Sequence, residues 1–150
     1  MFRPALAVIG MFLTTLAAAA DLQLMPNPQL KAVEVVKFQL DALRQNNDGD
    51  GIAATFRFAS PANKAQTGPL SRFSRLFDNP QYSPMLNHYS AEVELLSSSE
   101  TKASIGTALV DGNGDVHWYQ FELSRQTLPD CDGCWMTDAV VRVKQPGNSA

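Results

Sequence analysis

The stretch KASIGTALVDGNGDVHWYQFELS, residues 102–124, decides the fold class. Two runs rich in β-branched and aromatic residues, 102–110 and 116–124, flank a cluster of Asp, Gly and Asn at 111–115. Such clusters favour a tight reversal of the chain between two strands. The stretch therefore predicts an antiparallel β-hairpin, and similar patterns at 91–98 and 135–143 predict two further strands.

A helical period precedes these strands. Apolar residues recur at spacings of three and four between residues 33 and 43, which predicts a helix that begins at Asn27-Pro28 and ends at Asn46-Asn47. A second helix is predicted from Asp50 to just before Pro61, and a third from Pro69 to residue 79. Residues 60–68, SPANKAQTG, are predicted to be a connector. Because helices come first and strands follow, the predicted class is α+β with three helices on an antiparallel sheet.

The alternation within 116–124 assigns side chains to the two faces of the sheet. His117, Tyr119 and two apolar residues after them share the face expected to meet the helices, whereas Trp118 and Gln120 share the other. His117 and Tyr119 lie near the start of their strand, so they are candidate residues at the rim of a pocket. A single histidine in such a row is more often a hydrogen-bonded structural residue, and both interpretations stay open.

The last strand supplies a third candidate pocket residue, Asp138. Strict alternation places Trp135, Thr137, Ala139, Val141 and Val143 on one face, and Met136, Asp138, Val140 and Arg142 on the other. Asp138 is expected either to pair with Arg142 or to project into a cavity as a carboxylate with a raised pKa.

The first 20 residues have the pattern of a secretory signal peptide. Arg3 precedes an apolar run with small residues at its end, and Ala18-x-Ala20 fits a cleavage site before Asp21. A retained membrane anchor is the alternative. With Arg3 removed, 11 basic and 15 acidic residues give a net charge of −4, and the chain has no basic run. We therefore expect an exported, periplasmic or secreted protein that binds neither nucleic acid nor, after signal removal, a membrane.

Both cysteines lie in the motif CDGC, as Cys131 and Cys134. A zinc site is disfavoured because the chain has no second cysteine pair and only two histidines, His88 and His117. In an oxidising compartment the two thiols are expected to form a local disulfide that holds a loop. A thioredoxin-like redox pair is the alternative, but its cysteines need a helix N-terminus after a strand.

Two stretches are similar to calcium loops, and we expect neither to bind calcium. In the first, which starts at Asn46, the position that needs a bidentate glutamate is Arg57. In the second, which runs from Asp111 to Glu122, Val116 replaces the glycine of the sharp turn, and the flanks predict strands instead of helices. No other motif for a metal or a cofactor occurs, so we predict none.

Three segments, FRFASPANKAQTGPLSRF, YSPMLNHYSAEV and GCWMTDAVVRV, together resemble a bacterial and plant family of unknown function. That family is similar to the nuclear transport factor 2-like superfamily, which includes ketosteroid isomerase. The resemblance implies a domain in which three helices close a strongly curved, cone-like sheet. We expect this single domain to span residues 27–144, and the terminal residues 145–150 to form a flexible tail. It supplies no catalytic residues that can be assigned to this chain.

Three functions are compatible with these observations. The leading one is an exported binding or accessory domain whose pocket holds a small apolar or amphipathic molecule. The second is an isomerase or dehydratase with His117 or Asp138 as base and Tyr119 as donor. The third is a homodimerisation module whose contact is the outer sheet face, around Trp118 and Gln120.

Overall fold

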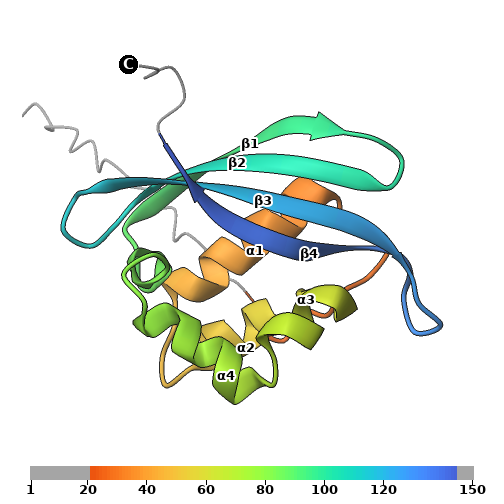
Figure 1. Ribbon diagram of the computed structural model, residues 1–150, viewed down its shortest axis with the longest axis horizontal. Helices are drawn as coiled ribbons and strands as arrows, with labels where there is room; N and C mark the ends of the chain where they lie inside the picture. The colour runs from red at the N-terminus through yellow and green to blue at the C-terminus, as the bar shows by residue number, and fades with distance from the viewer. Residues whose placement is uncertain (1–20, 145–150) are drawn as a thin grey trace, which may run out of the picture.

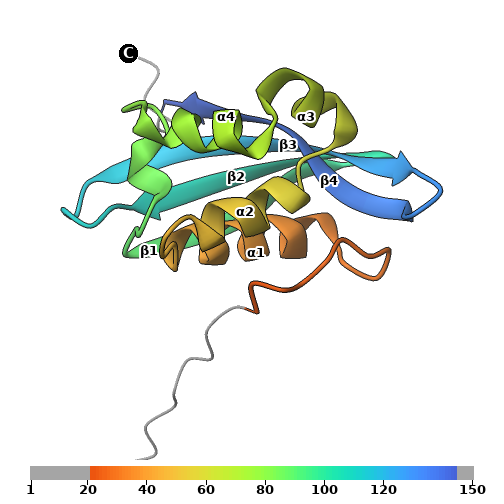
Figure 2. The same cartoon turned by 90° about the horizontal axis from the view of Figure 1, so that it is seen from below.

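The structure, a computed structural model, describes residues 21–144 and has two layers. The sheet has four strands. In Figures 1 and 2, the helices lie on one face of this sheet and leave the other face uncovered. Helices precede strands along the chain, so the predicted α+β class is confirmed. The predicted signal peptide at 1–20 and tail at 145–150 lie outside the described residues. Between residues 21 and 144, none of the helices is long and apolar enough to cross a bilayer.

The described helical layer contains more helices than the three predicted. It consists of α1 (Ala32–Arg44), α2 (Asp50–Arg57), α3 (Pro61–Thr67), α4 (Leu70–Ser74), and two short 3₁₀ turns, η1 (Arg75–Asp78) and η2 (Ser83–Met85). The helix α1 begins at Ala32, five residues after the predicted cap at Asn27. Asn27 instead closes a local turn, because its Oδ1 accepts a hydrogen bond from the backbone N–H of Gln29 at 3.2 Å.

The prediction of a connector at residues 60–68 is wrong, because Pro61–Thr67 form the helix α3. Ser60 Oγ accepts a hydrogen bond from the Asn63 backbone N–H at 3.2 Å, and Pro61 occupies the first helical position. Both features are standard helix starts. No residue of α3 is buried, so this helix has no apolar stripe from which it could be predicted.

The sheet is an antiparallel meander of β1 (Ser90–Ser98), β2 (Lys102–Val110), β3 (Val116–Thr127) and β4 (Asp132–Val143), in the order β1-β2-β3-β4. The predicted hairpin at 102–124 is confirmed, with Val110 opposite Val116. Its turn is built on Asp111, whose Oδ1 accepts hydrogen bonds from the backbone N–H groups of Asn113 and Asp115 at 2.8 and 3.0 Å.

The core lies between α1 and the inner face of the sheet. Tyr119, Phe121 and Leu123 are each at most 1% exposed, so the predicted inner face of β3 is confirmed for these residues. They belong to one apolar cluster with buried residues of α1, namely Ala32, Val35, Val36, Phe38, Leu40, Ala42 and Leu43.

The strict alternation predicted for the last strand is wrong, because a β-bulge at Asp138 interrupts it. Thr137 lies opposite Leu123, whereas Ala139 lies opposite Glu122, so Asp138 is an extra residue in β4. After the bulge the faces exchange: Val140 packs against the core, and Val141 is 46% exposed.

Candidate functional site

A cavity of about 210 Å³ lies between the helical layer and the inner face of the sheet. Most of its wall is apolar, and polar side chains come from α1, α2 and α3. The lining residues are Gln39, Leu43, Thr55, Asn63, Gln66, Thr67, Phe73, Leu76, Phe77, Tyr82, Met85, Phe121, Asp138, Ala139 and Val140. Apolar walls with a few polar groups are typical of small-molecule sites.

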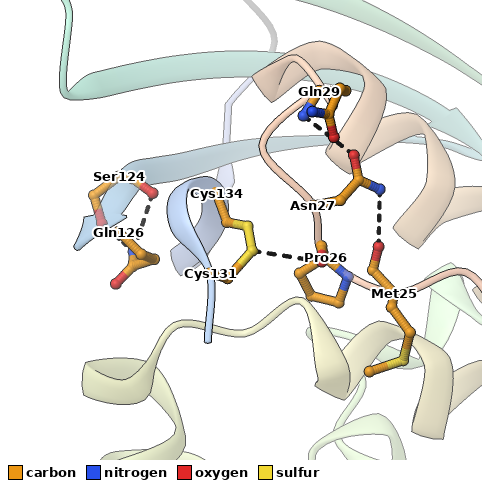
Figure 3. Close-up of a disulfide and its surroundings, with 8 residues drawn as sticks. All are labelled: Met25, Pro26, Asn27, Gln29, Ser124, Gln126, Cys131 and Cys134. Atoms are coloured by element: carbon orange, nitrogen blue, oxygen red, sulfur yellow. Dashed lines mark hydrogen bonds between the residues drawn. A yellow bond between two sulfur atoms is a disulfide. The ribbon is translucent and has the colours of Figure 1, made fainter. Parts of the chain in front are cut away.

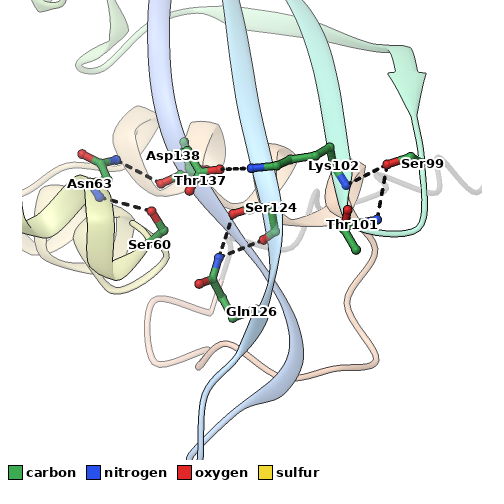
Figure 4. A network of polar contacts seen from close by, with 9 residues as sticks. All are labelled: Ser60, Asn63, Ser99, Thr101, Lys102, Ser124, Gln126, Thr137 and Asp138. Atoms are coloured by element: carbon green, nitrogen blue, oxygen red, sulfur yellow. Dashed lines mark hydrogen bonds and ion pairs between the residues drawn. The ribbon is translucent and has the colours of Figure 1, made fainter.

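A hydrogen-bond network fixes one side of this interior cavity. The Thr137 carbonyl accepts from the Ser60 backbone N–H at 2.9 Å and from Asn63 Nδ2 at 3.0 Å, which ties α3 to β4 (Figure 4). Thr137 Oγ1 donates to Gln39 Oε1 at 2.6 Å, and Gln39 Nε2 donates to the Thr55 carbonyl at 3.1 Å. The bulge therefore follows a residue that joins β4 to α1, α2 and α3.

Phe73 and Phe77 line the other side, with 5.6 Å between their ring centroids. Phe73 also packs against Phe56, which does not line the cavity, with 5.0 Å between the ring centroids. The hydroxyl of Tyr82 donates to the Val140 carbonyl at 3.1 Å. The segment after α4 is therefore held against β4 by a polar contact as well as by packing.

The sequence analysis did not identify the polar residues of this cavity. Gln39, Thr55 and Asn63 come from three separate helices, so no short sequence motif contains them. Only the Ser60-Pro61 helix start, with Asn63 three residues after Ser60, gives a local signal. That signal predicts a capped helix and does not indicate that its side chains meet Thr137.

Asp138 borders the interior cavity, but its carboxylate has a partner elsewhere. Asp138 Oδ2 lies 3.9 Å from Lys102 Nζ (Figure 4). Lys102 is exposed and adjacent to the inward-facing Ala103, so this ion pair lies on the outer side of the sheet. The expected pairing with Arg142 is therefore replaced by a pairing with Lys102.

His117 is hydrogen-bonded at both ring nitrogens. Nε2 lies 2.7 Å from Asp111 Oδ2, and Arg142 Nη2 lies 2.6 Å from Nδ1. A guanidinium can only donate, so Nδ1 accepts and the Nε2–H group donates to the carboxylate. This hydrogen bond is the main reason why the pKa of Asp111 lies below its ordinary value. These contacts fasten the β2–β3 turn to the end of β4.

Tyr119 is fully buried, and its hydroxyl donates to the Gln81 carbonyl at 2.8 Å. Burial raises its pKa to about 12, so the phenol stays protonated at neutral pH. Tyr119 does not line the interior cavity, nor does His117, whereas Asp138 does. The three candidate pocket residues therefore do not share this cavity, and each has a partner within the chain.

The outer face of the sheet has a separate groove of about 420 Å³. Among the residues that line it are Leu96 of β1, Gly106 and Ala108 of β2, and Trp118 and Gln120 of β3. A Cβ on Gly106 would lie 3.3 Å from the side chain of Leu96, so the missing side chain makes room there. Trp118 and Gln120, assigned to the outer face from the sequence, both line this groove.

The sequence was compared with known protein families, curated proteins and solved structures. A family model described as "Domain of unknown function (DUF4864)" matches residues 26–150. The chain belongs to this family. The predicted membership of a family of unknown function is therefore confirmed. No curated protein and no solved structure matches the chain, so the function of this DUF4864 domain is argued from its geometry.

The two cysteines of the DUF4864 domain form a disulfide with a Cα–Cα distance of 5.6 Å, within the usual range. The predicted pairing of Cys131 with Cys134 is confirmed, and Cys134 lies within β4, which begins at Asp132. Figure 3 places the disulfide beside the segment that precedes α1, where Cys131 Sγ lies 3.5 Å from the Pro26 carbonyl oxygen. The disulfide therefore lies at the start of β4, close to the N-terminal segment.

The two calcium-like stretches have structural roles in this domain. Asn46 Oδ1 accepts a hydrogen bond from the Ile52 backbone N–H at 3.1 Å, which organises the turn before α2. Both carboxylate oxygens of Asp111 are engaged, one by the hairpin turn and the other by His117. Within residues 21–144, no three His, Cys, Asp or Glu side chains are grouped in a way that could hold a metal.

Proposed function

We propose that this DUF4864 domain binds a small apolar or amphipathic molecule in the interior cavity. The observation that carries the proposal is the lining of that cavity, where Phe73, Phe77 and Phe121 face polar groups of α1, α2 and α3. The volume of about 210 Å³ lies below the roughly 300 Å³ at which drug-sized pockets begin. The ligand is therefore a compact molecule, comparable to a single substituted ring.

The polar margin supplies the orientation of such a ligand. Gln66 and Thr67 of α3 lie at the cavity beside Asn63, whose own Nδ2 is already engaged by Thr137. Gln66 is exposed and forms no side-chain hydrogen bond within the described residues. An amphipathic ligand would place its apolar part against the aromatic wall and its polar part toward Gln66.

A titration with indole, followed by amide chemical shifts, tests this function. We expect saturable shifts at residues of the cavity wall. Leu76→Trp should fill part of the cavity and weaken indole binding by at least about tenfold, a loss comparable to about 1.4 kcal/mol. Leu70→Trp is the matched control, because Leu70 is 39% exposed and does not line the cavity. Equal binding by both variants, or no saturable shift in the wild type, would contradict the proposal.

Export of the domain is part of the same proposal. It is supported by the apolar run and small residues at 1–20 and by the disulfide, which is compatible with an oxidising compartment. Mass spectrometry of protein recovered from an exporting host should find a chain that begins at Asp21 and has no free thiol. An uncleaved chain with two free thiols in the cytosolic fraction would argue against export.

The outer groove favours a second candidate function, self-association through the sheet. Trp118 lines this groove, and Leu96 and Val141 on the same side of the sheet are 53% and 46% exposed. Exposed apolar area of this kind is typical of an interaction surface. A homodimer would cover it with a second copy of the sheet.

Sedimentation equilibrium over a range of protein concentrations tests this homodimer. We expect a concentration-dependent dimer that Trp118→Arg shifts to monomer. Tyr89→Arg is the control, because Tyr89 is 76% exposed and does not line the groove. A wild-type chain that stays monomeric at every concentration would refute self-association without bearing on the interior cavity.

We also propose that the sheet closes in the cone-like manner of the nuclear transport factor 2-like superfamily. The order of elements supports this proposal, since helices precede a four-stranded antiparallel meander and cover one face of it. An experimental structure in which this sheet is flat would contradict it.

A further inference from the structure

A second polar site lies outside the interior cavity, where α1 runs beside the edge strand β1. A groove of about 240 Å³ separates these two elements at this place. Among the residues that line it are Lys37, Asp41 and Arg44 of α1, His88 before β1, and Ser90 at the start of β1. None of these five residues lines the outer groove or the interior cavity.

His88 contributes a fixed lone pair to this groove. Its side chain is 4% exposed, and its Nδ1 lies 2.8 Å from the Met85 carbonyl oxygen. A carbonyl oxygen only accepts, so Nδ1 carries the hydrogen and Nε2 of the neutral ring is an acceptor. Within the described residues, Nε2 has no hydrogen-bond partner and is not sealed from solvent. The groove therefore offers an unused acceptor on a rigidly held ring.

The α1 side of the groove carries charges of both signs. Lys37, Asp41 and Arg44 lie at helical spacings of four and three, so they follow one another along the same face of α1. Within residues 21–144, none of the three forms an ion pair. Each charge is therefore free to bind a group that comes from outside the chain.

These groups select a particular ligand chemistry. A plain oxyanion would meet the lysine and the arginine, but it would be repelled by Asp41 and would leave the His88 acceptor without a donor. A plain ammonium would fit Asp41 and His88 but would be repelled by the two cations. A molecule that carries an ammonium and a carboxylate a few bonds apart satisfies both sets.

We propose that this groove binds a small zwitterion of the amino-acid class. Its carboxylate accepts hydrogen bonds from Arg44 and Lys37, and its ammonium donates to Asp41 and to His88 Nε2. The volume of about 240 Å³ corresponds to roughly eight waters at about 30 Å³ each, which is enough for a small side chain as well. Leu40, Ala91 and Val93 supply an apolar surface for that side chain.

Calorimetric titration with L-alanine at neutral pH tests this site, with inorganic phosphate, acetate and methylammonium as separate probes. We expect saturable binding of L-alanine in the millimolar range and at least about tenfold weaker binding of the other three, because each lacks one of the charged groups. Tighter binding of phosphate than of L-alanine would overturn the zwitterion and indicate an oxyanion site. No saturable binding of any probe would overturn the site itself.

Two exposed side chains allow variants that leave the core intact. Asp41→Asn and Arg44→Gln should each weaken L-alanine binding by at least about tenfold, since each removes one charge-assisted contact. Asp78→Asn and Arg75→Gln are matched controls, because both residues are exposed on η1 and do not line the groove. Equal losses in variants and controls would overturn the assignment of these charges.

The ring of His88 gives a readout within the site. We expect its Cε1–H resonance to shift on addition of L-alanine in the wild type, and to shift far less in Asp41→Asn at the same concentration. A shift that persists unchanged in Asp41→Asn would overturn the placement of the ammonium. Binding of indole in the interior cavity should be unaffected by these variants, so the two sites can fail independently.

Discussion

Two buried threonines, Thr137 and Thr107, differ in their hydrogen bonds and predict opposite mutational effects. Thr137 is 2% exposed and donates to Gln39 Oε1 at 2.6 Å. Thr107 is 4% exposed, and its Oγ1 has no hydrogen-bond partner among residues 21–144. Thr137→Val should therefore destabilise the fold by about 1 to 3 kcal/mol, because it leaves a buried amide oxygen unpaired.

Thr107→Val is the matched control for this prediction. It replaces an unpaired buried hydroxyl with a methyl group of similar volume, so the free energy of unfolding should stay the same or rise by about 1 kcal/mol. Urea denaturation of both variants measures the difference. A loss of stability in Thr107→Val as large as that in Thr137→Val would contradict the hydrogen-bond argument.

His88 predicts how stability depends on pH. Burial lowers the pKa of His88 below the ordinary 6.5, and the positive charge of Arg44 lowers it further. The hydrogen bond to the Met85 carbonyl and the negative charge of Asp41 oppose this shift. The unfolded chain therefore binds a proton at pH values where the folded chain does not. The stabilisation by neutral His88 is fully present above pH 6.5 and is lost as the pH falls from there through the folded pKa.

The measurement is the urea midpoint of the wild type and of His88→Gln at several pH values between neutrality and the acid range. The wild type should lose stability as the pH falls below about 6.5, and the variant should show a flatter dependence over that interval. If the urea midpoints of the two proteins change with pH in parallel, His88 is not the source of the pH dependence of stability.

At the scale of single elements, α3 depends on its first residues. Its buried cap Ser60 is 1% exposed and accepts the Asn63 N–H at 3.2 Å. Ser60→Ala should cost about 0.5 to 2 kcal/mol of unfolding free energy, the usual range for a lost N-cap. Ser71→Ala, at an exposed position of α4, should change it by less than about 0.5 kcal/mol. Thermal denaturation of the two variants checks the prediction, and equal midpoints would contradict it.

The sequence predicted best those elements that alternate or repeat around a buried face. The hairpin of β2 and β3 and the inner position of Tyr119 follow from a period of two, and both are observed. In contrast, α3 buries no residue and is set by a cap and a proline, which a search for apolar stripes passes over. The start of α1 was misplaced because an Asn-Pro pair can cap a helix or close a turn.

At the scale of the whole molecule, the candidate site was only partly predictable. That helices cover one face of the sheet follows from the order of elements, so a space between the two layers was expected. Of its lining residues, Asp138 was among the candidates, but the others were not, because the bulge at Asp138 exchanges the faces of β4 and no residue type marks a bulge. His117 and Tyr119 have inward or edge positions, but their hydrogen bonds are to Asp111, Arg142 and Gln81, which are distant in sequence or lie in turns.

The segment before α1 gives a prediction at the same scale. Arg57 of α2 reaches across to this segment, where its Nη2 donates to the carbonyls of Leu22 and Leu24. Both leucines pack against the core cluster. Hydrogen bonds from Arg57 and the packing of the two leucines therefore both hold the first described residues against the rest of the molecule.

Arg57→Met should release this segment while the domain stays folded. Hydrogen exchange at the amide of Leu24, which donates to the Asp21 carbonyl at 3.1 Å, should become at least about tenfold faster, corresponding to about 1.4 kcal/mol of local stability. Amides in the centre of β3 exchange through global unfolding, and the free energy of unfolding should fall by no more than about 3 kcal/mol. Arg72→Met, at an exposed position of α4, is the control and should leave the exchange of Leu24 unchanged. If Leu24 exchanges at the same rate in both variants, the segment is held by leucine packing and not by Arg57.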